Sequence, residues 1–250
     1  MKDSAQKILG LIDLTSLNDN DTDVQITNLC SAASTQFGNV PAVCIYSRFI
    51  PLAKKLLPNN IKIATVTNFP HGSPDFDLAI LETKLAIERG ADEVDIVFPY
   101  HELIQGKYEI GAKMVSKAKK ICGTKRLKVI IESGALKKPN LIEQASTISI
   151  ENGADFIKTS TGKVEVNATL EAAEIMLNVI KHSGKKCGFK AAGGIKTVAV
   201  AIEYLDLATN IMGDNWIDAN TFRFGASGLL NDVLSNLNGI TNTQIGRAHV

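Results

Sequence analysis

Short apolar segments rich in β-branched residues alternate along the chain with stretches whose apolar residues recur at helical spacing. Eight of these segments are predicted strands: Leu11–Thr15, Val40–Tyr46, Ile61–Thr67, Glu93–Phe98, Leu127–Glu132, Phe156–Thr159, Gly188–Ala191 and Phe222–Gly225. Strands separated by helices are typical of right-handed βαβ units with parallel pairing. Eight such units in 250 residues predict an α/β protein with a single-domain (β/α)8 TIM barrel, and a doubly wound open sheet is the alternative.

The predicted helices have recognisable ends and apolar stripes. Ser73-Pro74 has the form of an N-cap followed by proline in the first turn, and Gly90 ends that helix. Further helices are predicted to begin near Thr169 and Thr197. We expect three stripes to pack on the core: Leu78, Leu81 and Leu85; Leu141, Ala145 and Ile148; and Ala173, Met176, Leu177 and Ile180.

The composition is that of an ordinary globular chain. Hydrophobic residues make up 45% and charged residues 21%, and 27 basic residues balance 26 acidic ones. No long basic block indicates nucleic-acid binding, and the apolar runs are shorter than a membrane span. The first seven residues lack the apolar core of a signal peptide. We therefore expect a cytoplasmic protein with no nucleic-acid or membrane partner.

The cysteines and histidines are scattered along the chain. The four cysteines include no Cys-x-x-Cys pair, which predicts reduced thiols rather than a disulfide framework. The four histidines show no His-x-His or HExxH spacing. We therefore expect no metal site and no cofactor.

The chain has no low-complexity linker, so we expect one domain over residues 1–237. Residues 238–250 are polar and aperiodic, and the last six resemble a translated sequencing adapter. We expect these thirteen residues to form a disordered or artefactual tail.

The segment Phe156–Lys163 places Lys158 within an apolar run, ahead of a polar loop that contains Gly162 and Lys163. A buried lysine is costly unless it is paired or deprotonated. A neutral lysine amine adds to carbonyls and forms Schiff bases, and the loop beyond it suits a phosphate. The segment indicates an imine-forming lysine beside a phosphate cradle. A strand-end lysine whose amine reaches solvent is the alternative.

Four successive predicted strands each contain a charge within an apolar run. These charges are Asp95, Lys128, Lys158 and Lys190, and Asp13 of the first strand is a candidate fifth. Inward residues of neighbouring barrel strands share layers. The pattern predicts a solvated working site at the C-terminal mouth of the barrel, and a buried ion-pair network is the alternative.

Physical roles follow from these charges. A Schiff-base lysine must be deprotonated near neutral pH, although a free lysine titrates near ~10.4. A second ammonium lowers that pKa, so Lys190 is expected to depress the pKa of Lys158. Asp95 then moves protons, directly or through a water. This chemistry needs neither a metal nor an organic cofactor.

Glycines follow the last two predicted strands at positions that suit an anion. Gly193 and Gly194 come shortly after Lys190, and Ser227 and Gly228 follow the final strand. The loops after strands seven and eight of such barrels often hold a phosphate through backbone N–H groups. Together with Gly162 and Lys163, these residues predict a phosphate cradle.

Several long motifs, in this order, resemble the deoxyribose-phosphate aldolase family over about residues 8 to 236. They are Ile12–Thr15, Thr65–Gly72, Glu93–Tyr100, Lys128–Glu132, Phe156–Lys163, Gly188–Lys190 and Arg223–Ser227. The resemblance implies reversible cleavage of 2-deoxy-D-ribose 5-phosphate to D-glyceraldehyde 3-phosphate and acetaldehyde. It also implies a class I, imine mechanism in deoxynucleoside breakdown.

The family pattern also assigns roles to individual residues. It implies that Lys158 forms the imine, that Lys190 is its partner lysine and that Asp95 shuttles protons. The implied phosphate contacts are Gly162, Lys163, Gly193, Gly194 and Ser227, and the candidate lining residues are Asp13, Thr15 and Lys128. The expected partners are a sugar phosphate and acetaldehyde, with a homodimer as the candidate assembly.

Two departures from the family pattern and three alternative functions qualify this reading. Gly228 stands where a second serine often follows Ser227, which affects phosphate affinity. The terminal tyrosine of longer members has no counterpart, so we expect slower proton exchange on the acetaldehyde unit. The alternatives are another class I sugar-phosphate aldolase or transaldolase, a catalytically inactive phosphometabolite-binding barrel, and a metal-dependent aldolase.

Overall fold

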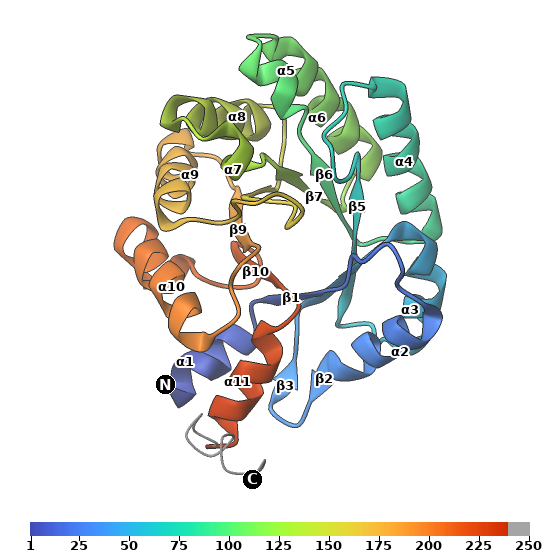
Figure 1. Ribbon diagram of the computed structural model, residues 1–250, viewed down its shortest axis with the longest axis vertical. Coiled ribbons are helices and arrows are strands. Elements are labelled where there is room, and N and C mark those ends of the chain that lie inside the picture. The colour runs from blue at the N-terminus through green and yellow to red at the C-terminus, as the bar shows by residue number, and fades with distance from the viewer. Residues whose placement is uncertain (240–250) are drawn as a thin grey trace.

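The eight strands predicted from the sequence are all present and close into a barrel (Figure 1). The computed structural model describes residues 1–239. The barrel strands are β1 (Ile12–Thr15), β4 (Ala42–Ile45), β5 (Lys62–Thr67), β6 (Glu93–Val97), β7 (Arg126–Ile130), β8 (Phe156–Lys158), β9 (Gly188–Ala192) and β10 (Phe222–Ala226). All eight neighbouring pairs are parallel, and β10 pairs with β1. The predicted TIM barrel is confirmed, and the open sheet is excluded.

Helices surround the barrel on all sides in Figure 1. They are α1 (Lys2–Leu9), α2 (Asp23–Ala32), α3 (Ile50–Leu56), α4 (Phe76–Arg89), α5 (Tyr100–Ile104), α6 (Tyr108–Cys122), α7 (Ser133–Leu136), α8 (Pro139–Glu151), α9 (Leu170–Ser183), α10 (Val198–Met212) and α11 (Leu229–Leu237). A short hairpin of β2 (Ser34–Thr35) and β3 (Gly38–Asn39), which the apolar pattern did not predict, follows α2. Helix α1 packs against α11, so the first and last described helices are neighbours.

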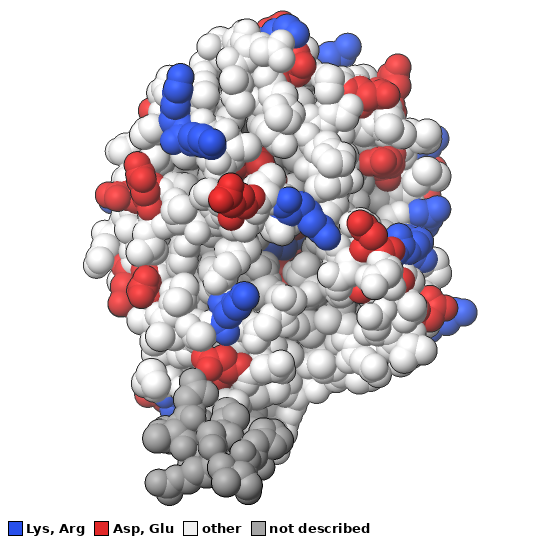
Figure 2. All heavy atoms as spheres, in the orientation of Figure 1, with Lys and Arg blue, Asp and Glu red and all other residues white. Residues whose placement is uncertain are grey.

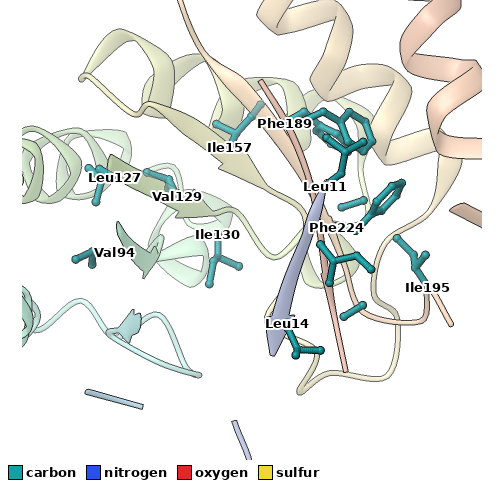
Figure 3. Packing of buried hydrophobic residues seen from close by; sticks show 14 of the residues in the cluster. Leu11, Leu14, Val94, Leu127, Val129, Ile130, Ile157, Phe189, Ile195 and Phe224 are labelled. Carbon is teal, nitrogen blue, oxygen red and sulfur yellow. The ribbon is translucent and has the colours of Figure 1, made fainter. Parts of the chain in front are cut away.

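Side chains of the barrel strands alternate between the helices and the barrel interior. Phe222 lies with ring centroids 5.6 Å from Phe189 and 4.9 Å from Phe224, on the side that faces the helices. Figure 3 shows Phe189 and Phe224 within this buried cluster, together with Leu11. Arg223, between Phe222 and Phe224, and Lys190, next to Phe189, therefore point into the barrel.

One predicted stripe is wrong, because the large leucines of α4 face away from the barrel. Leu78, Leu81 and Leu85 are 49%, 52% and 38% exposed. The buried residues of α4 are Ala79, Thr83 and Ala86. These small side chains let the helix lie close to β5, where the Thr83 and Thr67 hydroxyls are 3.3 Å apart. The stripe of α9 is buried as predicted, and that of α8 is partly buried.

The predicted helix ends are confirmed at three positions and wrong at one. Thr169 and Thr197 cap α9 and α10 through their side chains, and Gly90 ends α4 in the left-handed region. The N-cap of α4 is Asp75 rather than Ser73, since its carboxylate accepts from the N–H of Leu78. The Ser73 hydroxyl instead accepts from the Asp75 N–H.

Helix α11 ends at Leu237, the residue at which the sequence analysis placed the domain end. Apart from Asn238 and Gly239, the predicted tail lies outside the described residues. Within residues 1–239, no helix combines the length and the apolar character that a membrane crossing requires.

Candidate active site

Three lysine side chains from three neighbouring strands meet on one aspartate inside the barrel. The register of β6, β7, β8 and β9 pairs Asp95 with Lys128 and pairs Lys158 with Lys190. The Lys158 Nζ lies 3.0 Å and the Lys190 Nζ 2.8 Å from Asp95 Oδ2. The Lys128 Nζ lies 2.7 Å from Asp95 Oδ1. The structure therefore brings together the three residues that the sequence analysis placed in catalysis.

A second set of charges adjoins the first and comes from β1, β6 and β10. Asp13 accepts from the Lys190 Nζ at 2.5 Å and from the Arg223 guanidinium. Glu93 lies 2.6 Å from the Lys128 Nζ and 3.2 Å from the Arg223 Nη2. We call these seven residues the buried charge network: Asp13, Glu93, Asp95, Lys128, Lys158, Lys190 and Arg223.

Two members of this network, Glu93 and Arg223, were not assigned a role from the sequence. Arg223 lies between Phe222 and Phe224, which is the same signal, a charge inside an apolar run, that singled out the lysines. Glu93 precedes Asp95 by two residues on β6, so both point to the same side of the sheet. The rule of a charge inside an apolar run therefore finds Arg223, whereas Glu93 is found only by its spacing from Asp95.

The expectation of a solvent-filled cage is wrong. The side chains of the network are between 0% and 3% exposed, and each is paired with an opposite charge. The reason is the additional carboxylate of Glu93, which gives Lys128 and Arg223 a partner. The site is therefore a buried ion-pair network, in which Lys158 is level with Lys190 in the strand register and two residues closer to the mouth than Lys128.

The contacts single out one lysine as the amine that can lose its proton. Lys190 contacts two carboxylates and Lys128 contacts three. Among the described residues, Lys158 has an ion-pair contact with Asp95 alone. Burial is the largest cause that lowers the pKa of Lys158, and Lys190 lowers it further against the opposing effect of Asp95.

The other members of the network are held in their charged forms. Burial disfavours each charge, but the attraction to neighbouring opposite charges outweighs the cost of burial. The pKa of Lys190 is raised by Asp13 and Asp95, and that of Lys128 by Asp95 and Glu93. Conversely, Lys128, Lys158 and Lys190 hold the pKa of Asp95 well below its usual value. The network thus places an amine with a lowered pKa beside an ionised carboxylate.

The opposite wall of the barrel interior is apolar. It comes from β4, β5 and the loop after β1, and consists of Leu17, Cys44, Ala64 and Val66, with Tyr46 and Phe69 packed against them. Burial raises the pKa of the Cys44 thiol, so Cys44 is a packing residue rather than a nucleophile. An apolar wall facing an amine suits a small substrate with an alkyl end.

A buried glutamate after β7 supports the loop that follows β8. Glu132 has a positive φ of 54°, and its Oε2 accepts from the Thr161 hydroxyl at 2.5 Å. The Thr161 hydroxyl in turn accepts from the Lys163 N–H at 3.1 Å. This chain of hydrogen bonds fixes the start of the predicted phosphate loop. Glu132 was not predicted as a site residue, because the predicted strand Leu127–Glu132 extends through it.

The glycines of the predicted phosphate cradle adopt conformations that favour glycine. Gly162, Gly193 and Gly194 have φ values of 82°, 85° and 84°. A side chain at Gly193 would lie 2.6 Å from the Asn167 side chain, so the loops after β8 and β9 touch. Lys163 and Ser227 are exposed. Figure 2 shows charged side chains of both signs around a hollow near the centre of one face.

The candidate lining residue Thr15 lies at the end of β1 and points to the same side as Asp13. Its hydroxyl donates to the backbone oxygen of Asp13 at 2.8 Å. Of the other candidates, Asp13 and Lys128 are fully buried parts of the charge network. They therefore hold the site together from below rather than forming its open surface.

A side chain at Gly225 would press on Lys190, which would have to shift to make room. An added Cβ would lie 2.9 Å from Lys190 Cε and 3.0 Å from Ala192 Cβ. We expect Gly225→Ala to cost about 1–3 kcal/mol of unfolding free energy and to lower turnover roughly 10-fold by displacing Lys190. Gly10→Ala is the control, since its Cβ would lie 3.6 Å from the nearest atom. Equal unfolding midpoints in urea would contradict this expectation.

The buried carboxylates predict a loss of stability in acid. The pKa values of Asp13, Glu93 and Asp95 are all lowered in the folded protein, because their cationic neighbours outweigh burial. Their contribution to the unfolding free energy is therefore complete above the ordinary carboxyl pKa of ~4 and is lost as pH falls below it. Urea unfolding at a series of pH values measures this slope. Glu93→Gln removes one of the three titrating groups and is expected to flatten it.

Comparisons with known proteins identify the family and agree with the fold. Residues 7–234 match the family described as DeoC/LacD family aldolase. A Toxoplasma gondii protein, provisionally named deoxyribose-phosphate aldolase, superposes with a TM-score of 0.89 at 22% identity, covering 97% of each chain.

Two further solved structures resemble the chain. A provisionally named deoxyribose-phosphate aldolase from Coccidioides immitis has a TM-score of 0.82 at 27% identity, covering 92% of this chain and 87% of that one. The deoxyribose phosphate aldolase from Aeropyrum pernix, described as having a unique tetrameric structure, has a TM-score of 0.73 at 25% identity, covering 95% and 93%. Since the family match spans most of the sequence, this chain belongs to the DeoC/LacD aldolase family.

Proposed function

We propose that this aldolase cleaves 2-deoxy-D-ribose 5-phosphate reversibly to D-glyceraldehyde 3-phosphate and acetaldehyde. The observation that carries the proposal is the position of the Lys158 amine, buried and paired with a single carboxylate, Asp95, at 3.0 Å. Such an amine forms an imine with an aldehyde and needs no metal for that step.

The first half of the reaction builds the imine. The neutral Lys158 amine adds to the aldehyde carbon of the open-chain sugar, and the carbinolamine that forms loses water to leave a protonated imine. Asp95, held ionised by its lysines, accepts and returns the protons directly or through a water. Lys190 keeps a positive charge beside Lys158 and disfavours a second ammonium there.

The second half breaks the carbon–carbon bond. A base removes the proton of the hydroxyl on the third sugar carbon, the bond between the second and third carbons breaks, and its electron pair moves into the imine. D-glyceraldehyde 3-phosphate leaves, and an enamine of two carbons remains on Lys158. Protonation of the enamine and addition of water release acetaldehyde and restore the amine. The apolar wall around Cys44 and Val66 suits the two-carbon unit.

The phosphate is proposed to bind where the loops after β8, β9 and β10 adjoin. Gly162, Gly193 and Gly194 offer backbone N–H groups, and Lys163 and Ser227 offer exposed side chains. The Asn167–Gly193 contact supports this grouping, since it joins two of the loops. Gly228, at the N-cap of α11, retains a backbone N–H for the same anion.

We further propose that the enzyme acts in deoxynucleoside breakdown in the cytoplasm, as a homodimer and on a free sugar phosphate. Sedimentation of the purified chain at two concentrations tests the dimer separately from the chemistry.

Borohydride trapping tests the reaction class and the substrate together. Reduction in the presence of 2-deoxy-D-ribose 5-phosphate or acetaldehyde should fix a covalent adduct on the peptide that contains Lys158. A panel of other sugar phosphates distinguishes this substrate from that of another class I aldolase or transaldolase. An adduct absent from Lys158, or turnover that stops in EDTA, would refute the imine mechanism.

A further inference from the structure

The charge network continues below the residues that the reaction uses. Glu93 and Arg223 contact each other at 3.2 Å, and neither touches Lys158 or Asp95 in an ion pair. Both line a cavity of about 1110 Å³ whose lining residues include the first residues of β6, β7 and β9. This pair therefore lies between the candidate site and the opposite end of the barrel.

Among the seven buried members of the network, the charges balance only if one lysine is neutral. Arg126, which also contacts Glu93, is partly exposed and stands outside this count. Asp13, Glu93 and Asp95 supply three negative charges, and Lys128, Lys190 and Arg223 supply three positive ones. Lys158 is the seventh member, and its amine is neutral in the balanced state. Buried charges without a partner are costly, so any change in this count alters how readily Lys158 takes up a proton.

Each member of the lower pair acts on Lys158 through a shared neighbour. Glu93 holds Lys128, which also binds Asp95. Arg223 holds Asp13, which also binds Lys190. Glu93 and Arg223 carry opposite charges. Removing Glu93 therefore makes the surroundings of Lys158 more positive, and removing Arg223 makes them more negative.

We propose that Glu93 and Arg223 are positioning residues whose charges set the pH at which the Lys158 amine becomes reactive. The inference rests on the proposed function, in which that amine is the nucleophile. The titratable groups facing Lys158 from all sides enter the same balance: Asp95 of β6, Lys128 of β7, Lys190 of β9, Asp13 of β1, Cys44 of β4 and Glu132 after β7.

The test measures the reactivity of the Lys158 amine without relying on turnover. The purified protein is labelled briefly with acetic anhydride at a series of pH values between about 5 and 10, and peptide mass spectrometry gives the pH midpoint for Lys158. We expect Glu93→Gln to lower the midpoint by about one pH unit and Arg223→Met to raise it by about one unit. The double variant should return near the wild-type midpoint.

Two further variants test whether the direction of the midpoint shift depends on charge. Arg223→Lys preserves the charge and should leave the midpoint near that of the wild type. If Arg223→Met does not fold, Arg126→Met replaces it, because Arg126 also binds Glu93, at 2.9 Å, and its loss should raise the midpoint by a smaller amount. Midpoints that do not move, or that move in the same direction for both charge removals, overturn the inference.

The outcome separates this inference from the proposed function. If the midpoints of the two variants shift in opposite directions but the wild-type protein does not cleave the sugar phosphate, the charge balance is established and the proposed reaction is refuted. If the wild-type protein cleaves the sugar phosphate and is trapped at Lys158, but the midpoints of the variants do not move, only the charge balance is refuted.

Discussion

Lys158→Met is expected to reduce turnover by roughly 10⁴-fold or more, because no other group can form the imine. Methionine has nearly the same length as lysine and no nucleophilic amine, so the shape of the site is little affected. Trapping by borohydride should disappear together with turnover. Mass spectrometry of the reduced protein and a coupled assay for D-glyceraldehyde 3-phosphate measure the two effects.

The same substitution should not destabilise the protein. Asp95 keeps its contacts with Lys128 at 2.7 Å and with Lys190 at 2.8 Å, and an apolar side chain of similar volume often replaces a buried ion without loss. We expect an unfolding free energy equal to or above that of the wild type. Lys62→Met, at the exposed start of β5, is the matched control and should retain turnover. Residual trapping in Lys158→Met would show that a different lysine forms the imine.

Much of the barrel could be predicted because its strands repeat one pattern. Each strand is a short apolar run that lies between two stretches with helical spacing. Gly90 is the C-cap of α4, and Gly153 follows the C-cap of α8. The orientation of α4 could not be predicted from the same pattern. Leu78, Leu81 and Leu85 have the spacing of a core stripe, but the core face needed the smaller Ala79 and Ala86.

The candidate site could be predicted where one of its charged residues interrupts the apolar pattern of a strand. A charge in an apolar run identified Asp95, Lys158 and Lys190, and parallel neighbours brought them together. The number of charges was harder to predict, because Glu93 opens its strand and does not interrupt it. The support of the Thr161 hydroxyl by Glu132 depends on a positive φ at a non-glycine residue, which has no sequence signal.

The roles of Lys158 and Asp95 can be separated by a second substitution, since they contribute differently to the reaction. Asp95 accepts from all three lysines, whereas Lys158 supplies the nucleophile. Asp95→Asn keeps the shape of the side chain and removes its charge. The remaining carboxylates, Asp13 and Glu93, still hold Lys190 and Lys128. Lys158 alone loses its only ion-pair partner among the described residues.

We expect Asp95→Asn to lower turnover by roughly 10²- to 10⁴-fold and to cost about 3–5 kcal/mol of unfolding free energy. The pKa of Lys158 should fall further, because the loss of Asp95 removes the charge that raised it. Trapping of acetaldehyde at Lys158 should therefore persist while turnover falls. Asp92→Asn is the control, since its pair with Lys125 is partly exposed and contributes about 1 kcal/mol or less. The proposed mechanism also uses Asp95 while the imine forms, so trapping should be slower than in the wild type. Complete loss of trapping in a folded Asp95→Asn protein would mean that water cannot replace Asp95 in that step.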